Sequence, residues 1–350
     1  MKILVVKRDK IGDLLLTTPM INHLRSSFPS AQIHLLGNDY NAWVLKGNAD
    51  IDRLWVYRRV RVGRRVRIGA ALRIVGLQWQ LWRQNFDVAI VANGIEAPRA
   101  IWRATSTRAK RVIAYVGNAS KYPGVTDPLQ VDESEHEADR ITRLLTPLDI
   151  AMSDKPVFPK FALPENARRF AQQWLMERQL VPRRYLVLGL GARHRQRQPS
   201  TGQILEWTQH FKREWGLDTV FMWTPGSGDD PLYPGDDDIA EPVLQANTAQ
   251  IYPFRGPIEP ALGLIWNAAT SIFPDSGLMH LAAASPGGVL GLFADTARQP
   301  APARWAPRGM NVDYLEAPNA VTELPNEVVY SRLERLLGGG AMRAREAATR

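Results

Sequence analysis

Short apolar runs alternate with longer amphipathic stretches along almost the whole chain. A short apolar run bounded by turn residues is typical of a buried parallel strand, and apolar residues at helical spacing are typical of a helix packed beside it. In the first half, the predicted strands are 2–7, 31–36, 52–57, 86–92 and 111–116, and the predicted helices are 13–27, 69–84, 96–104 and 135–147.

The second half repeats this alternation after a proline-rich segment, 150–164, which we interpret as a linker. Its predicted strands are 185–190, 218–223, 270–273 and 288–293, and its predicted helices are 165–179, 201–215, 237–246, 259–268 and 277–285. Parallel strands joined by helices predict an α/β protein with a doubly wound sheet in each half. We therefore expect domains at 1–155 and 165–325, a closing helix at 326–337 and a disordered tail at 338–350.

The predicted helix 69–84 carries an apolar stripe at helical spacing. Its members are Leu72, Val75, Trp79 and Trp82. A stripe that faces the protein core is the favoured interpretation. A stripe that faces a membrane, beside the arginine-rich segment that precedes it, is the alternative.

Composition is that of an ordinary globular protein, with 45% hydrophobic and 23% charged residues among 350. This length fits two domains of about 150 residues each. No stretch approaches the roughly 18 apolar residues that span a bilayer, and the apolar run near Met1 is too short for a signal peptide. Without cysteine, the chain has neither disulfides nor thiolate metal ligands. We expect a cytoplasmic protein.

The net charge of +9 is unevenly distributed. Residues 58–67, RRVRVGRRVR, hold six arginines and no acid, whereas 229–238 is acidic. The basic segment suits an anionic membrane surface or a phosphorylated glycolipid, and a solvated basic loop is the alternative. Nucleic acid is disfavoured, because no stacking aromatic residues interleave with the arginines. Alternating valines and arginines, with Gly63 available for a turn, predict a basic hairpin here.

A first candidate for chemistry is KRDKIGD, residues 7–13, directly after the apolar run Ile3 to Val6. The loop after such a strand is where α/β proteins place catalytic and phosphate-binding groups. Asp13 is predicted at the carboxyl edge of the sheet, facing a cleft between the domains. It is either a catalytic residue or a first-turn acid that stabilises a helix. A helix N-terminus is expected to lower the pKa of Asp13.

A second candidate is the segment PDSGLMHLAAA near the other end of the chain. Gly277 permits close approach of the backbone, and the amides of Ser276 to Leu278 are placed to bind a diphosphate at a helix start. The alternative is an ordinary turn in which Asp275 and Ser276 cap the helix. His280 lies one turn further along, and a lone helical histidine is more often structural.

A third candidate is the loop GLGARHRQRQPS, residues 189–200, after the first predicted strand of the second half. Arg193, Arg195 and Arg197 suit a phosphate clamp, because a guanidinium group pairs with phosphate in a bidentate manner.

These segments carry a family resemblance. MKILVVKRDKIGDLLLTTPMINHLRSSFP resembles the opening of the glycosyltransferase family 9 proteins, the lipopolysaccharide heptosyltransferases and their relatives. PDSGLMHLAAA, followed by GLFADTARQPAPARWAP, resembles the donor-site segment of that family. The resemblance covers most of the chain and is weaker at about 58–136 and 224–250. It implies the GT-B architecture, in which two Rossmann-like domains face each other, the first on the acceptor side and the second binding the nucleotide sugar.

The resemblance also implies roles for individual residues. Asp13 takes the place of the family's catalytic base, and Asp275 lies near the donor sugar. The family's Lys-x-Trp-Pro is replaced by Arg197-Gln198-Pro199, so Arg197, or Arg195 in a shifted register, substitutes for the phosphate-binding lysine. The implied site comprises catalytic Asp13, acceptor-side Lys7 and Gly12, and donor-binding Arg195, Arg197, Asp275, Ser276, Gly277, Leu278 and His280.

The function expected from this resemblance is inverting, metal-independent sugar transfer without a cofactor. The donor is a nucleotide sugar, with ADP-heptose expected, and the acceptor is a lipopolysaccharide core or related surface glycan. Reversible contact with the inner face of the cytoplasmic membrane is expected, and nucleic acid is not a partner. A nucleotide-sugar epimerase of the same fold and a catalytically silent binding protein are the alternatives.

Two other motifs are interpreted structurally. Asp236, Asp237 and Asp238 resemble an acidic metal-binding triplet, but they follow Pro234-Gly235 where a helix begins, so helix capping is the favoured interpretation. The first strand is followed by one glycine, Gly12, and not by G-x-G-x-x-G, which argues against a nicotinamide dinucleotide site.

Overall fold

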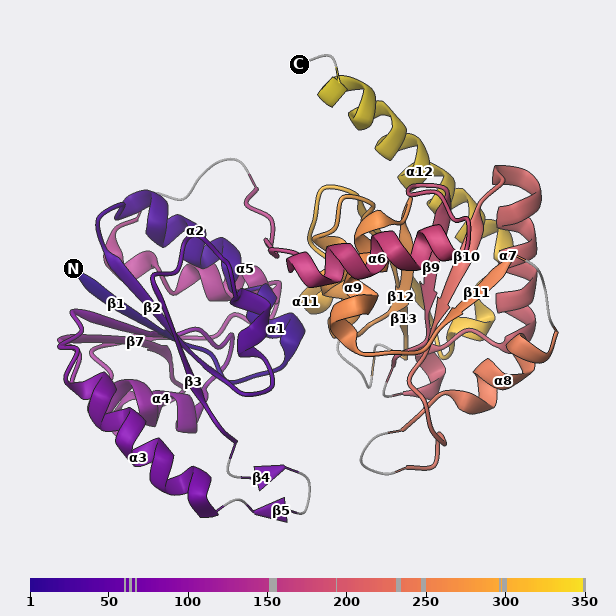
Figure 1. The fold of residues 1–350 in the computed structure, drawn as a ribbon. Helices are drawn as coiled ribbons and strands as arrows, with labels where there is room; N and C mark the ends of the chain where they lie inside the picture. The colour runs from indigo at the N-terminus through magenta and orange to yellow at the C-terminus, as the bar shows by residue number, and fades with distance from the viewer. Residues whose placement is uncertain are drawn as a thin grey trace. The chain divides into compact units, whose positions relative to one another are not determined.

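The computed structural model describes residues 1–59, 61–62, 65–66, 68–150, 156–192, 194–230, 234–246, 250–295, 297 and 301–348. The chain divides into two compact units, Met1–Ala162 and Leu163–Arg350. Each unit contains a six-stranded parallel sheet covered by helices (Figure 1). The α/β class and the pair of doubly wound, Rossmann-like domains expected of a GT-B protein are therefore confirmed.

The sheet of the first unit has the strand order β3-β2-β1-β6-β7-β8. Helices α1, α2 and α5 cover one face, and α3 and α4 cover the other (Figure 1). The strands are β1 (Lys2–Val6), β2 (Gln32–Asn38), β3 (Arg53–Tyr57), β6 (Val88–Val91), β7 (Arg111–Tyr115) and β8 (Asp127–Leu129). The helices are α1 (Ile11–Leu15), α2 (Thr18–Ser27), α3 (Ile68–Trp82), α4 (Pro98–Thr105) and α5 (Glu137–Arg143).

The sheet of the second unit has the corresponding order β11-β10-β9-β12-β13-β14. Its strands are β9 (Tyr185–Gly189), β10 (Asp218–Met222), β11 (Ile251–Phe254), β12 (Ser271–Pro274), β13 (Val289–Ala294) and β14 (Val312–Ala317). Its helices are α6 (Glu165–Glu177), α7 (Thr201–Trp215), α8 (Asp237–Gln245), α9 (Ile258–Asn267), α10 (Gly277–Ala283), α11 (Pro302–Trp305) and α12 (Asn326–Ala348).

Both sheets reverse their winding direction at one pair of neighbouring strands. In the first unit the reversal lies between β1 and β6, and in the second it lies between β9 and β12. The loops that leave the carboxyl ends of such strands diverge to opposite faces of the sheet and open a crevice, where ligands of α/β proteins bind. The fold thus defines an equivalent position in each unit for a functional site.

Aliphatic and aromatic side chains fill the space between each sheet and its helices. Strands buried on both faces need apolar side chains at successive positions, as β1 and β9 have. In the second unit, Trp207 and Phe211 of α7 are completely buried against the sheet, together with Leu333 of α12. Burial of this kind contributes about 1.5–3 kcal/mol for each large side chain. Packed cores hold the strand ends, and hence the loops that follow them, in place.

The arginine-rich segment forms the predicted hairpin over the residues that the structure describes. Strands β4 (Arg61–Val62) and β5 (Arg65–Val66) pair antiparallel. Residues 60, 63, 64 and 67 lie outside the described residues, and so does the predicted turn at Gly63. Three sheet strands, β8, β11 and β14, were not predicted from the sequence. They are short or carry exposed polar residues, so they lack the continuous apolar run by which the other strands were recognised.

The core-facing interpretation of the stripe on α3 is wrong for the three members whose side chains are described. Val75, Trp79 and Trp82 are exposed. The core is instead contacted by Leu81, with Ile74 and Leu77 packed beside it. Periodicity did not distinguish the two stripes, because α3 is apolar on both sides. No helix in the described part of the chain is long and apolar enough to cross a membrane.

Two helix boundaries differ from the sequence-based expectation. The helical stretch predicted at 13–27 contains Pro19, which predicts either a kink or a second helical piece capped by Thr18. The structure has the second arrangement, shifted by one residue: α1 and α2 are separate, Thr17 is the N-cap of α2, and Pro19 lies in its first turn. Helix α12 was expected to end at residue 337 and to be followed by a disordered tail, but it continues to Ala348. Glycine lowers helix stability without preventing a helix, and the residues after Gly340 are mostly good helix formers.

Candidate active site

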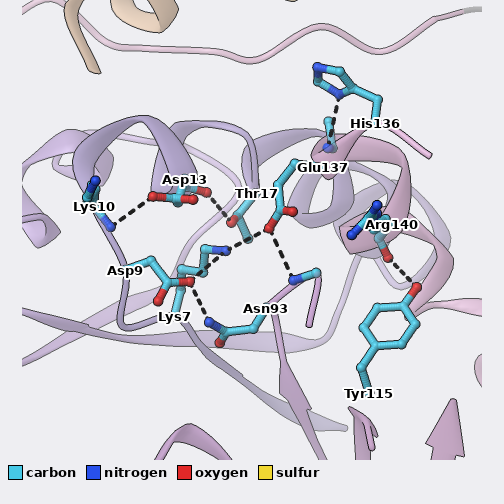
Figure 2. A network of polar contacts seen from close by, with 12 residues as sticks. Lys7, Asp9, Lys10, Asp13, Thr17, Asn93, Tyr115, His136, Glu137 and Arg140 are labelled. Atoms are coloured by element: carbon cyan, nitrogen blue, oxygen red, sulfur yellow. Dashed lines mark hydrogen bonds and ion pairs between the residues drawn. The ribbon is translucent and has the colours of Figure 1, made fainter. Parts of the chain in front are cut away.

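The loop that leaves β1 in the first unit begins with a completely buried lysine, Lys7. Its Nζ lies 3.2 Å from Oδ2 of Asp9 and 3.7 Å from Oε1 of Glu137 (Figure 2). A buried ammonium group needs such partners, because its desolvation is otherwise costly. Lys7 therefore joins the β1 loop to the start of α5.

Glu137 and Asn93 connect the end of β6 to the same cluster. The backbone N–H of Gly94 donates a hydrogen bond of 3.1 Å to Oε1 of Glu137, and Nδ2 of Asn93 donates to Oδ2 of Asp9. A β-carbon at Gly94 would overlap the Glu137 carboxylate, so a larger residue here would displace that side chain. The cluster thus spans both strands at which the sheet reverses, the position where α/β proteins bind ligands.

Asp13 lies on α1, beside this cluster (Figure 2). The backbone N–H of Lys10 donates a hydrogen bond of 3.0 Å to Oδ2 of Asp13, so the carboxylate does stabilise the helix start. Its surroundings nevertheless contain the charged groups of Lys7, Asp9 and Glu137. The catalytic and the helix-stabilising interpretations of Asp13 are compatible, because the hydrogen bond from the Lys10 N–H uses only one of the two carboxylate oxygens.

The expectation that a helix N-terminus lowers the pKa of Asp13 is wrong in sign. Burial is the largest influence and raises the pKa of this carboxyl. Lys7 opposes the increase, Asp9 and Glu137 add to it, and the Lys10 N–H opposes it more weakly. Desolvation thus outweighs the backbone hydrogen bond. A carboxylate with a raised pKa is a stronger base, which suits proton abstraction.

In the second unit, the loops after β9 and β12 bring an arginine and an aspartate together. Nη1 of Arg197 lies 2.7 Å from Oδ2 of Asp275, and these side chains are only 7% and 11% exposed. Arg197 ends a 3₁₀ turn, Arg195–Arg197, and Asp275 directly follows β12. The pair occupies the strand reversal of this sheet, the counterpart of the Lys7 cluster.

The segment after Asp275 forms the start of α10. Ser276 is the N-cap, and its Oγ accepts a hydrogen bond of 3.4 Å from the N–H of Met279. Gly277 and Leu278 are the first helical residues. His280 is buried in α10, with its ring centroid 6.4 Å from that of Trp305. Capping by Ser276, predicted as the alternative, is therefore observed, and the Gly277 and Leu278 amides belong to the first turn.

The sequence left open whether Arg195 or Arg197 replaces the family's lysine, and the structure gives the two arginines different partners. Arg195 forms an ion pair with Asp238 of α8 and its side chain is half exposed. Arg197 instead faces Asp275. Arg193 lies outside the described residues. By geometry, Arg197 is the arginine associated with the segment that follows β12.

The acidic triplet stands at the start of α8, as predicted, with Asp237 and Asp238 in the first turn, but its carboxylates also bind a neighbouring loop. Asp236 is the N-cap residue of α8 but makes no side-chain capping bond; its carboxylate accepts hydrogen bonds from the Thr224 N–H at 2.8 Å and from Gln198 Nε2 at 2.5 Å. Asp237 accepts from Trp223 Nε1 and the Gly226 N–H. These carboxylates fasten the loop after β10. No group of three His, Cys, Asp or Glu side chains among the described residues is arranged to hold a metal ion.

Sequence reasoning missed three members of the first cluster. Asp9 stands within KRDKIGD, Asn93 directly follows a predicted strand, and Glu137 lies in the predicted helix 135–147. A polar residue directly after a second strand is a usable signal, because neighbouring parallel strands end at the same sheet edge. Nothing local in the sequence indicates Glu137, since its partner Lys7 is far away along the chain.

Comparison with known proteins agrees with this architecture. Residues 74–324 match the family model described as glycosyltransferase family 9 (heptosyltransferase). No curated protein sequence matches the chain.

Solved structures of similar fold cover nearly the whole chain. A family 9 glycosyltransferase from Veillonella parvula DSM 2008 has 19% sequence identity and a TM-score of 0.78, with 96% of this chain and 97% of that chain covered. E. coli ADP-heptose lps heptosyltransferase II has 16% identity and a TM-score of 0.71, covering 96% and 98%. E. coli heptosyltransferase WaaC with ADP has 16% identity and a TM-score of 0.72, covering 96% and 100%. Since the family model matches well over half of the residues, the chain belongs to glycosyltransferase family 9.

Proposed function

We propose that this glycosyltransferase moves a sugar, with heptose from ADP-heptose as the first candidate, to a hydroxyl group of a lipopolysaccharide core or related surface glycan. Structures of a similar enzyme, E. coli heptosyltransferase WaaC, have been solved with ADP and with ADP-2-deoxy-2-fluoro heptose, which supports a nucleotide-sugar donor here. The observation that carries the chemistry is Asp13, a carboxyl of raised pKa at a strand reversal beside a buried lysine.

In the proposed reaction Asp13 accepts the proton of the acceptor hydroxyl. The acceptor oxygen forms a bond to the anomeric carbon of the donor sugar, and the bond from that carbon to the diphosphate oxygen breaks. Attack on the face opposite to the leaving diphosphate inverts the anomeric configuration. The raised pKa of Asp13 supports this role, because a base works best when its pKa lies close to the working pH.

Lys7 and Gly12 belong to the acceptor side in this proposal. Lys7 is held by Asp9 and Glu137, so we assign it to positioning the β1 loop and to tuning the charge around Asp13. Gly12 is buried in α1 directly before Asp13.

The leaving diphosphate is assigned to the start of α10 and to Arg197. The amides of Ser276, Gly277 and Leu278 open this helix, and the helix dipole favours an anion at that end. A guanidinium group carries several N–H donors, so Arg197 is able to bind a carboxylate and a phosphate together. Asp275 orients Arg197 and lies where the donor sugar is expected. We assign His280, buried further along α10, a role in supporting this helix start.

The arginine-rich segment, 58–67, supports reversible contact with an anionic surface. Arg58 and Arg59 precede the β4–β5 hairpin, and each basic residue near an anionic leaflet contributes about 1 kcal/mol. Lipid and phosphorylated core sugars both carry negative charge, so this segment suits an enzyme whose acceptor is a glycolipid.

Thermal-shift screening across nucleotides and nucleotide sugars tests the donor, because a ligand that binds the folded state raises its melting temperature. The stabilising donor is then incubated with candidate glycan acceptors, and the anomeric configuration of the product is read by NMR. We expect stabilisation by ADP-heptose and transfer with inversion. Release of an isomerised free sugar would indicate an epimerase, and stabilisation without turnover across the acceptors would indicate a binding protein.

A further inference from the structure

Helix α3 presents apolar side chains on two sides. Its inner side contributes Leu81, with Ile74 and Leu77 beside it, to the core of the first unit. Its outer side exposes 69% of Val75, 54% of Trp79 and 41% of Trp82. A soluble amphipathic helix ordinarily has polar residues on this second side, so the outer stripe of α3 is unusual.

Helix α4, on the same face of the sheet, carries a further exposed tryptophan. Trp102 is 55% exposed. Nε2 of Gln78 on α3 donates a hydrogen bond of 3.0 Å to the carbonyl oxygen of Arg103 on α4, which holds the helices together. Figure 1 shows α3 and α4 on the same side of the sheet. We call the surface formed by Val75, Trp79, Trp82 and Trp102 the tryptophan face.

Positive charge surrounds the tryptophan face. Neither α3 nor α4 contains an acidic residue. The guanidinium carbon of Arg83 lies 4.8 Å from the ring centroid of Trp79, and that of Arg108 lies 5.9 Å from the ring of Trp82. Arg73 and Arg99 are exposed on the same two helices. The surface is therefore apolar at its centre and cationic around it.

This combination matches the interface of an anionic bilayer. Tryptophan is favoured at the level of lipid headgroups, where its ring is apolar and its N–H meets water, and arginine near such a surface is attracted to anionic headgroups. A second copy of this chain fits less well. In a two-fold dimer formed through this face, the arginines of both copies would meet without any acid on these helices to compensate them.

We propose that the tryptophan face inserts into the headgroup region of an anionic membrane and orients the protein there. This inference deepens the proposed contact with an anionic surface, on which it rests, and assigns the insertion to tryptophans of α3 and α4. The arginines of 58–67 attract the membrane from a distance, and the tryptophans add apolar contact that salt does not screen.

The test is sedimentation of the full chain with vesicles of phosphatidylglycerol and phosphatidylcholine, compared with phosphatidylcholine alone. The variants are the triple substitution Trp79→Ala, Trp82→Ala, Trp102→Ala, and the pair Arg58→Ala, Arg59→Ala. Met176→Ala is the control, because it removes an even more exposed apolar side chain, 73% exposed, from the second unit. Melting temperature and donor stabilisation establish that each variant is folded.

We expect the triple variant to bind mixed vesicles at least about tenfold more weakly, equivalent to about 1.4 kcal/mol, with the Met176 control unchanged. Vesicles with brominated acyl chains should quench the tryptophan fluorescence of the parent and not that of the triple variant. If the triple variant binds and is quenched like the parent, the inference is wrong. If only the variant Arg58→Ala, Arg59→Ala binds vesicles more weakly, the proposed contact with an anionic surface stands and insertion by the tryptophan face is wrong. Concentration-dependent dimers in the parent that are absent from the triple variant would assign the face to self-association and also overturn the inference.

Discussion

The strand reversals of the two sheets have the same topology and opposite chemistry. At the end of β1 and β6, a buried lysine is surrounded by the carboxylates of Asp9, Asp13 and Glu137. At the end of β9 and β12, Arg197 and Asp275 form a pair beside the first turn of α10. The first arrangement raises the pKa of a carboxyl and suits proton transfer, whereas the second presents a cation and backbone amides and suits an anion. The fold sets the place of each site, and a few side chains set its chemistry.

Removal of the carboxylate of Asp13 is expected to have the largest effect on activity. Asp13→Asn keeps an oxygen for the Lys10 N–H but loses the proposed base, so turnover should fall by about 10²- to 10⁴-fold while donor affinity is unchanged. Steady-state transfer assays and calorimetric donor titrations measure both quantities. Turnover close to that of the parent would exclude Asp13 as the base.

The stability of the same variant has a predicted sign. Because the folded-state pKa of Asp13 is raised, the folded protein holds this proton more tightly than the unfolded chain does. The group therefore favours the folded state at low pH, and this contribution is lost as pH rises through the folded-state pKa. At neutral pH, Asp13→Asn places an uncharged side chain where the parent has a partly desolvated carboxylate. The melting temperature of the variant should therefore equal or exceed that of the parent. A marked decrease would show that the carboxylate is mainly structural.

Substitution of Arg197, at the strand reversal between β9 and β12, is expected to weaken donor binding, with a smaller effect than the loss of turnover in Asp13→Asn. Arg197→Ala removes the proposed charge-assisted contact to the diphosphate and should weaken donor binding by about 1.5–3 kcal/mol, or about 10- to 150-fold. Arg195→Ala is the matched control, because Arg195 is paired with Asp238 and should matter little. Arg197→Lys, which keeps a positive charge beside Asp275, separates loss of binding from loss of folding. Equal donor affinity in the Arg197 variants and the parent would remove this loop from the site.

A shift in pH dependence without a large change in maximal rate is expected from Glu137→Gln. The Glu137 charge raises the pKa of Asp13, so its removal should lower that pKa and move the acid limb of the pH–rate profile to lower pH. The amide oxygen remains available to the Gly94 N–H. Glu133→Gln removes one nearby exposed charge and serves as the control. An unmoved acid limb, with the variant folded, would separate Glu137 from the catalytic carboxyl.

Chelation should have the smallest effect. The carboxylates of Asp236, Asp237 and Asp238 are occupied by backbone and side-chain partners, so this triplet is poorly suited to a metal ion. Transfer should therefore continue in EDTA. Loss of transfer that magnesium or manganese restores would return the triplet to consideration.

Several parts of the molecule followed from local sequence. Runs such as ILVV predicted β1 and its neighbours, and the segments after the first strand of each half predicted the loops at the strand reversals. The choice between Arg195 and Arg197 did not follow, because both lie within one short turn and only their partners distinguish them. Placement of the α3 tryptophans failed for a related reason, since two apolar stripes on one helix compete equally for the core.

The sequence by itself determined the alternation of strands and helices, the family, and the positions of Asp13, Arg197 and Asp275 next to strand ends. These properties depend on local periodicity and on short motifs. Only the tertiary structure decided that Lys7 is paired with Glu137 and that burial raises the pKa of Asp13. It likewise decided that tryptophans of α3 face outward. Electrostatic environment and burial arise from residues far apart in the chain, so no local pattern contains them.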